Sequence, residues 1–342
     1  MPRPPESAFP ADEHRPQWFE QFLADRGTRK PSAHTLKAYR QDFDAIGSLV
    51  ADDPADLVRL PLAVIDTEAM RSAFAEYART HEAASIRRCW STWNVLCTFL
   101  FTAELIPANP MPMVGRPKQP KPLPKSLPAD AVSALLAALS AGPQRPRSTD
   151  WLERDRAIII TGLLAGLRAD EMLRANIGDL RRTDDGAVIQ VRGKGDKDRR
   201  IPVEAVLVDV LEHYLDSRKI RFPHLTRRSS PAGGLAGWPA GAPLFVGGDG
   251  QRITRGILQY RVLRAFRQAG IDATRAKGAL LHGLRHTFAT ELANADVSVY
   301  VLMNLMGHES MTTSQRYISA AGIDTRDAAA KSGLYEIVRS TE

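Results

Sequence analysis

The segment IPANPMPMVGRPKQPKPLPKSLP, residues 106–128, divides the sequence into two parts that differ in pattern and in charge. Proline removes backbone donors and breaks helices, so this proline-rich segment is typical of an extended linker. It also carries four cations, which would give the linker a basic face: Arg116, Lys118, Lys121 and Lys125. We therefore predict a domain boundary near residue 118 and a Pro/Lys-rich linker over residues 107–128.

The positive charge of the chain is concentrated after this boundary. The 342 residues include 46 Lys+Arg and 39 Asp+Glu, a formal net charge of +7. Residues 1–118 contain 14 Lys+Arg and 15 Asp+Glu, a net charge of −1. Residues 119–342 contain the other 32 Lys+Arg and 24 Asp+Glu, a net charge of +8. A basic excess in the second part indicates a polyanionic partner whose binding weakens with salt.

The sequence has no segment typical of a membrane span or of a secreted protein. The longest apolar run, AIIITGLLAG at 157–166, is shorter than the roughly 20 residues of a spanning helix, so we predict a buried helix there. Residues 1–14 are proline-rich and charged, unlike a signal peptide, and are predicted to be a flexible extension. In a helix, Cys89 and Cys97 would lie about 12 Å apart, too far for a disulfide, as expected in the cytoplasm.

Residues 15–106 are predicted to form a helical domain. Apolar residues recur at helical spacing in 15–27, in 32–50, where Ser32 is a plausible cap, and in 66–80, where Asp66 is one. A further helix over 84–104 would carry Arg87 and Arg88 outside and the following core stripe: Ile86, Trp90, Trp93, Cys97 and Leu100.

After the linker we predict a mainly α-helical domain with one small β-hairpin or sheet. The segment AVIQVRGKGDKDRRIPV, 187–203, has two alternating stretches around a Gly/Asp turn, which predicts the hairpin. The Gly/Pro/Ser-rich segment 223–243 is predicted to be a long mobile loop. Helices are expected at about 129–139, 151–166, 169–175, 204–217, 254–269, 283–295, 298–306, 312–320 and 324–338.

The segment LLHGLRHTF, 280–288, places an arginine between two histidines. His282 and His286 are four apart and would share a helix face, as zinc ligands often do, but the cation Arg285 beside them disfavours a dication. His282 and Arg285 are three apart and could present an imidazole and a fork of donors to one tetrahedral anion. His286 would then be a packed, hydrogen-bonded residue.

Three further motifs are unremarkable when taken singly. In AGLRADEML, 165–173, Arg168 follows a buried helix and could satisfy helix-end carbonyls or pair with Glu171. In RGKGDKDRR, 192–200, Lys194 sits at a hairpin tip, where it could be solvated or could deliver a proton into a groove. In LMGHESMTTSQRYISA, 305–320, Gly307 would end a helix and expose His308, and the next helix would present Tyr317.

Together and in this order, these motifs resemble those of the tyrosine recombinases, also called the phage integrase family, and in particular its Xer-type members. The resemblance covers roughly residues 15–340 and is most specific in GLRADEML, HGLRHTFAT and LMGHESMTTSQRY. It implies a two-domain, C-shaped DNA clamp. Its parts would be a core-DNA-binding domain (15–106), a catalytic domain (129–320) and a C-terminal docking helix and tail (321–342).

The resemblance also implies a chemistry without metal, cofactor or ATP. Tyr317 would attack a DNA phosphodiester and form a 3′-phosphotyrosyl link, while Arg168 and Arg285 hold the non-bridging oxygens. His282 and His308 would bond the phosphate, and His282 would accept the tyrosine proton. Lys194 would protonate the leaving 5′-oxygen, and two residues would support the site: Glu171 and His286.

The implied partner is duplex DNA with a specific recombination site. By the same resemblance, a homotetramer, or a heterotetramer with a related recombinase, would exchange strands between two sites in the nucleoid. The process would be Xer-type resolution, or integration and excision of a phage or mobile element. The candidate DNA contacts are Arg87, Arg88, Arg116, Lys118, Lys121, Lys125, Arg192 and Arg199.

Three alternatives stay open at the level of sequence. A swivelling topoisomerase would use the same Tyr/Arg/His chemistry on one strand and would relax plasmids that lack a specific site. A DNA-binding accessory or excision factor would bind without forming a covalent adduct. A zinc hydrolase built on His282 and His286 would lose activity on chelation.

Overall fold

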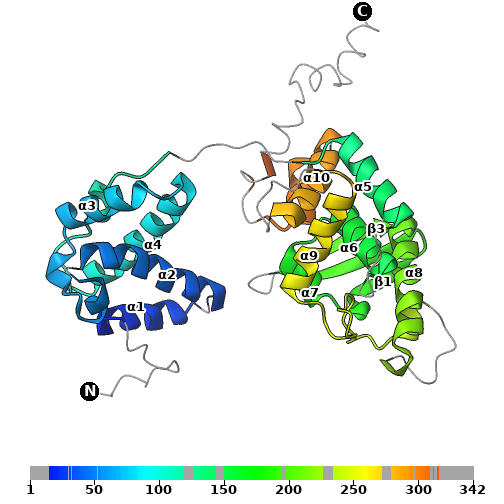
Figure 1. Cartoon of the computed structure of the whole chain (residues 1–342), viewed down its shortest axis with the longest axis horizontal. Helices are drawn as coiled ribbons and strands as arrows, with labels where there is room; N and C mark the ends of the chain where they lie inside the picture. The colour runs from blue at the N-terminus through cyan, green and yellow to red at the C-terminus, as the bar shows by residue number, and fades with distance from the viewer. Residues whose placement is uncertain are drawn as a thin grey trace, which may run out of the picture. The chain divides into compact units, whose positions relative to one another are not determined.

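The protein is described by a computed structural model, which divides the chain into two compact units, residues 1–121 and 122–342 (Figure 1). The described residues are 15–29, 31, 33–51, 53–118, 126–142, 150–193, 198–225, 234–271, 279–295, 297–308, 311 and 314–315. Several predicted features lie outside them: the extension 1–14, the Ser32 cap, Lys121, Lys125, Lys194, Tyr317 and the segment 321–342. Each unit is described by itself.

The first unit is helical, as predicted. Its α-helices are α1 (Gln17–Gly27), α2 (Ala33–Val50), α3 (Thr67–Ala78) and α4 (Ala83–Thr102). Short 3-10 turns follow α2 and α4: η1 (Pro54–Arg59), η2 (Leu62–Val64) and η3 (Met111–Met113). The predicted cap is confirmed, because the Asp66 carboxylate accepts from the Ala69 N–H at 2.8 Å.

An aromatic core with one buried carboxylate holds these helices together. The Phe43 ring lies between Phe19 and Trp93, with ring centroids 4.0 and 5.5 Å away. Beside it, Asp42 is fully buried and accepts hydrogen bonds from Arg88 Nε and Thr92 Oγ1, both at 2.8 Å. A buried carboxylate is costly unless it is paired and bonded, so this site depends on the α4 donors. Both cysteines are free and buried, as expected.

The second unit surrounds a small sheet with helices. Its α-helices are α5 (Ala129–Ala141), α6 (Leu152–Ala165), α7 (Ala169–Arg174), α8 (Ala205–Arg221), α9 (Arg255–Gln268), α10 (Ala279–Asn294) and α11 (Val299–Met306). Three 3-10 turns are η4 (Ile177–Asp179), η5 (Pro223–Leu225) and η6 (Gly234–Gly237). The seven helices predicted between residues 129 and 306 agree with these bounds to within four residues, whereas those predicted at 312–320 and 324–338 fall largely or wholly outside the described residues. Among the described residues, no helix has the length and apolar character that a membrane span requires.

The sheet contains the predicted hairpin and one strand that the sequence did not reveal. Strands β1 (Leu180–Thr183), β2 (Gly186–Arg192) and β3 (Asp198–Glu204) are antiparallel in the order β1-β2-β3. In the hairpin, Val191 pairs with Arg199 and Ile189 with Ile201. Strand β1 was missed because three of its four residues are exposed, so it shows no apolar alternation.

The prediction of a mobile loop over 223–243 is wrong for residues 234–243. Trp238 is buried, and the Arg218 guanidinium lies 4.1 Å from the centroid of its ring. The backbone N–H groups of Ile177 and Gly178 donate to carbonyls of this segment at 2.9 and 2.8 Å. Glycine and proline suggested a loop, but they did not show that a tryptophan anchors it.

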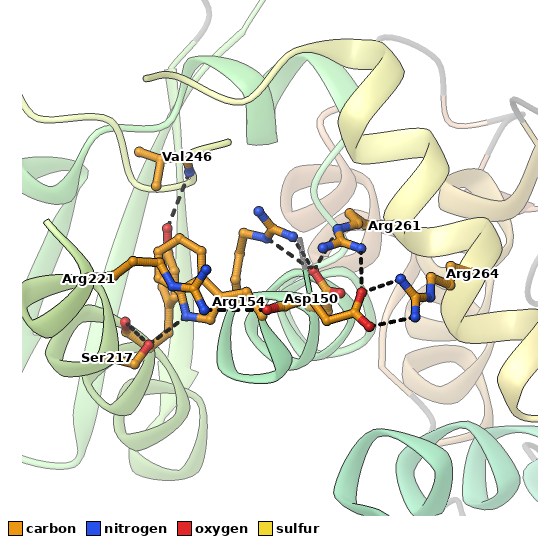
Figure 2. Close-up of polar contacts among 10 residues, drawn as sticks. Asp150, Arg154, Ser217, Arg221, Val246, Arg261 and Arg264 are labelled. Carbon is orange, nitrogen blue, oxygen red and sulfur yellow. Dashed lines mark hydrogen bonds and ion pairs between the residues drawn. The ribbon is translucent and has the colours of Figure 1, made fainter. Parts of the chain in front are cut away.

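Helix α6 is fixed at its start by a largely buried ion network (Figure 2). Arg264 and Arg261, both on α9, donate to the Asp150 carboxylate just before α6, at 2.6 Å from Arg264 Nη2 and 3.2 Å from Arg261 Nη1. Arg154 donates to Asp155 at 3.0 Å and is buried. This network joins the first turn of α6 to α9. Gly166 lies at the other end of α6, about 20 Å from the network along this 14-residue helix.

Candidate active site

Two glycines in the left-handed conformation shape the corner where the predicted motifs meet. Gly166 ends α6 with φ 57°, and a Cβ there would lie 2.3 Å from the Phe288 ring of α10. Gly307 ends α11 with φ 59°, and a Cβ there would lie 3.0 Å from Arg199 Nη1 and 3.3 Å from Arg168 Nη1. Only glycine suits such positions without strain, and its missing side chain lets two guanidinium groups approach the end of α11.

Glu171 is the buried anion at the centre of this corner. Its carboxylate accepts from the Arg168 N–H at 2.7 Å and from Arg168 Nη1 at 2.9 Å. Arg199 on β3 donates to both oxygens of the same carboxylate, each at 2.8 Å. Burial alone would raise the pKa of Glu171, but the hydrogen bonds and charge of Arg199, together with the hydrogen bonds from Arg168, lower it to about 2. Glu171 is therefore ionised at neutral pH and orients both arginines.

Arg168 and Arg285 are brought together on adjacent carbonyls. Arg168 Nη2 donates to the Gly307 carbonyl at 2.7 Å. Arg285, on α10, donates from Nη1 to the Gly166 carbonyl at 2.5 Å and from Nη2 to the Met306 carbonyl. The Arg285 side chain is 4% exposed and that of Arg168 is 37% exposed. Arg168 therefore makes both of the contacts that the sequence suggested, a bond to a helix-end carbonyl and an ion pair with Glu171. Part of its side chain is still exposed and could contact a ligand.

Two histidines flank the arginine pair, and both favour the neutral form. His308 follows Gly307, and its Nδ1 lies 2.9 Å from the Oγ of the buried Ser314. Burial and then the charges of Arg285, Arg168 and Arg199 lower the pKa of His308 to about 4. His282 is one turn before Arg285 on α10, and partial desolvation followed by the charges of Arg285 and Arg168 lowers its pKa. Both rings can therefore donate and accept hydrogen bonds at neutral pH.

The zinc alternative gains no support from the geometry. The His282 and His286 rings have centroids 6.0 Å apart, so they lie on the same side of α10. A structural or catalytic zinc needs at least three protein donors. Within the described residues, no group of three or more His, Cys, Asp or Glu side chains converges.

Comparison with known proteins identifies the family. A family model described as the Phage integrase family matches residues 125–322, more than half of the chain. The chain belongs to the phage integrase family. The resemblance predicted from the motifs is therefore confirmed, and with it the enzyme class, a tyrosine site-specific recombinase.

Curated relatives of this phage integrase family protein match over most of their length. The tyrosine recombinase XerC of Rhodospirillum centenum is 31% identical over 307 residues, which cover 88% of this chain and 81% of the relative. The tyrosine recombinase XerD of Proteus mirabilis is 29% identical over 305 residues, which cover 89% and 86%.

Solved structures show the same fold. The XerH recombinase bound to its palindromic difH substrate, in a post-cleavage complex, has a TM-score of 0.65 and 19% identity, covering 94% of this chain and 85% of that one. A lambda integrase dimer bound to a COC′ core site has a TM-score of 0.62 and 18% identity, covering 90% and 78%. The predicted fold class, mainly α with a small sheet, is confirmed.

Of the predicted catalytic positions of this integrase-family chain, the described residues contain four, and they gather at one corner: Arg168, His282, Arg285 and His308. Lys194 and Tyr317 lie outside the described residues. Two further residues of this corner, Arg199 and Ser314, were not predicted to belong to the site. Ser314 had no signal of its own, but the alternation of β3 could have found Arg199, which shares a face with the buried Ile201 and Val203.

The candidate DNA contacts in the first unit are held by their own unit. Arg88 is bonded to the buried Asp42, yet 57% of its side chain is exposed. Arg87 Nη1 donates to the Pro117 carbonyl at 2.5 Å, and the Arg116 guanidinium lies 4.6 Å from the centroid of the Trp90 ring.

Of the other predicted DNA contacts among the described residues, two are exposed and one is largely buried. Lys118 is exposed, and Arg192 is exposed 3.9 Å from an Asp179 carboxylate oxygen. Arg199 is only 9% exposed and is fully engaged within the corner. It is therefore better described as part of the site than as a surface contact.

Proposed function

We propose that this recombinase cleaves and rejoins duplex DNA at specific sites with Arg168 and Arg285 as its phosphate clamp and Tyr317 as its nucleophile. The observation that carries the proposal is the convergence of Arg168, just before α7, and Arg285, on α10, on the neighbouring Gly307 and Met306 carbonyls. A planar guanidinium can bond two oxygens of one phosphate, and two of them can neutralise the charge that develops there. The Arg168 side chain is 37% exposed, so we infer that DNA reaches the clamp from the side of Arg168.

Tyr317 would attack the scissile phosphorus, and the bond to the 5′-oxygen would break. A tyrosine hydroxyl has a pKa of about 10, so it needs a base and a stabilised transition state. His282 is neutral at neutral pH and can accept that proton. If the Ser314 hydroxyl donates to His308 Nδ1, the ring proton lies on Nε2, where it can be donated to a phosphate oxygen.

Chain connectivity supports the two assignments that lie outside the described residues. Tyr317 follows Ser314 by three residues, a span of at most about 11 Å, and Ser314 contacts His308. Lys194 precedes Arg199 by five residues, a span of at most about 18 Å, and Arg199 is bonded to Glu171. These short spans support placing both side chains at the corner, where Lys194 would protonate the leaving 5′-oxygen.

The solved structures of relatives support a DNA substrate and an oligomeric assembly. The XerH and lambda integrase structures hold DNA, and one lambda integrase structure is a tetramer bound to a Holliday junction. We infer that this chain acts on a duplex recombination site as a tetramer, of one chain or with a related recombinase, in the nucleoid. Its two units would close on DNA as a clamp, and residues 321–342 would dock on a neighbour. The process would be Xer-type resolution, or integration and excision of a phage or mobile element.

The test is a covalent-trapping experiment on a nicked suicide substrate that carries the recombination site. The unaltered protein is expected to form a 3′-linked adduct, while Tyr317→Phe binds the same DNA and forms none. An adduct with Tyr317→Phe would show that another nucleophile acts. DNA binding by the unaltered protein without any adduct would favour an accessory DNA-binding role, and relaxation of plasmids that lack a specific site would favour a topoisomerase.

A further inference from the structure

Arg199 is a largely buried cation beside the turn end of the β2–β3 hairpin, whose connection carries Lys194. On β3 it shares a face with Ile201 and Val203, which are both buried, and its side chain is 9% exposed. Its Nε donates to the Leu305 carbonyl at 2.9 Å, and its two Nη atoms donate to Glu171 at 2.8 Å. A surface DNA contact does not need such an environment.

These three bonds fix the position of the guanidinium. The bidentate pair with Glu171 sets the plane of the group, and the bond to Leu305 comes from the third nitrogen. Glu171 is also the acceptor of Arg168, and Leu305 lies two residues before Gly307. Arg199 therefore joins β3 to the two elements that hold the proposed phosphate clamp.

The hairpin register carries this constraint toward Lys194. Val191 pairs with Arg199 and Arg192 with Asp198, so the paired part of the hairpin ends one residue beyond the anchored Arg199. Lysine has a long, flexible stem, and a small misplacement of a catalytic group lowers the rate of its step, so the position of the backbone at Lys194 affects proton delivery by its ammonium group. Arg199 lies one residue pair from the end of the strands, so its bonds fix the backbone from which the connection with Lys194 starts.

We propose that Arg199 is a positioning residue for the leaving-group step: it registers the hairpin that carries Lys194 against the arginine clamp. The inference rests on the proposed function, in which Lys194 is the general acid. In that step the Tyr317 oxygen forms a bond to phosphorus and its proton passes to His282. The bond from phosphorus to the 5′-oxygen breaks, and that oxygen takes a proton from the Lys194 ammonium.

The test compares DNA cleavage on two substrates that differ in one atom. A 5′-bridging phosphorothiolate leaves as a thiolate and needs no proton, so a defect confined to the general acid disappears on it. Arg199→Gln is expected to slow single-turnover cleavage of the oxygen substrate by roughly 10²-fold, since general acids contribute about 10²–10⁴ and misplacement removes much of that. On the sulfur substrate the variant should cleave within about threefold of the unaltered protein.

Two control variants distinguish a defect in the general acid from a defect in the phosphate clamp. Lys194→Ala should show the same rescue, because it removes the acid itself. Arg285→Lys should be equally slow on both substrates, because it impairs the clamp on the non-bridging oxygens. DNA affinity and thermal unfolding are measured for each variant, and Arg199→Lys, which keeps the charge beside Glu171 but not the three bonds, replaces Arg199→Gln if that variant does not fold.

The outcomes separate this inference from the function on which it rests. Rescue of both the Arg199 and the Lys194 variants supports it. An Arg199 variant that stays slow on the sulfur substrate while Lys194→Ala is rescued would show that Arg199 acts through the clamp, and unchanged cleavage of the oxygen substrate would show that it positions nothing. Failure to rescue Lys194→Ala would remove lysine from the acid role and would overturn the inference at its foundation.

Discussion

Glu171→Gln should destabilise the second unit because it leaves two arginines without their common anion. The carboxylate accepts four hydrogen bonds from Arg168 and Arg199, at 2.7 to 2.9 Å, and its side chain is 7% exposed. A glutamine removes the charge and replaces one acceptor oxygen by an NH₂ group that faces guanidinium donors. Breaking one partner of a buried pair typically costs about 3–5 kcal/mol.

The lowered pKa of Glu171 gives an independent value for its contribution to the free energy of unfolding, and it predicts how that contribution depends on pH. A fall in the pKa from 4.5 to about 2 on folding corresponds to about 3 kcal/mol at neutral pH. Because the folded pKa is the lower one, this stability is fully present above about pH 4.5 and is lost as the pH falls toward 2. The glutamine variant has no such titration, so the gap between the two proteins should narrow over this range.

Urea denaturation of both proteins at a series of pH values measures this gap. We expect the free energy of unfolding of the second unit to be about 3 kcal/mol lower for Glu171→Gln at pH 7, with convergence below pH 4.5. Glu153→Gln, an acidic-to-amide change at another position of the same unit outside these bonds, serves as the matched control. A gap below about 1 kcal/mol at pH 7, or one that does not vary with pH, would refute the reasoning.

Three further changes test the rest of the corner. Arg285→Ala should slow covalent complex formation by about 10²–10³ while DNA affinity stays within a few fold, and an equal loss of affinity would contradict a role specific to the transition state. His308→Gln should remove part of the acid destabilisation of the protein. The pKa of His308 is lowered to about 4, so its contribution to stability falls as the pH drops from 6.5 toward 4, and an unchanged stability profile would count against that environment. Gly166→Ala should lower the thermal midpoint, because its Cβ would meet the Phe288 ring at 2.3 Å, and an unchanged midpoint would show that the corner relaxes freely.

The periodic and local features of this protein could be predicted from its sequence. The helices of both units follow apolar spacing and capping residues such as Asp66, and the hairpin follows alternation around a turn. The motifs around Arg168, Arg285 and His308 also marked the corner, because each lies at a helix end or on a helix face whose chemistry is visible in a short stretch.

The features that could not be predicted depend on partners far away in the chain. Arg199 is bonded to Leu305, which is 106 residues later, so a short basic stretch suggested a DNA contact rather than an anchor. Trp238 is covered by Arg218 from α8, a contact that the surrounding glycines and prolines do not indicate. Strand β1 is mostly exposed and is defined by its pairing with β2 rather than by its own pattern.

The central claim is that the arginine pair holds a DNA phosphate while Tyr317 displaces its 5′-oxygen. It is tested most directly by mass spectrometry of the peptide that carries the trapped nucleotide, together with analysis of the released DNA end. The account predicts a single adduct on Tyr317, linked to a 3′-phosphate, and a free 5′-hydroxyl on the other fragment. An adduct on any other residue, or a link to a 5′-phosphate, would contradict it.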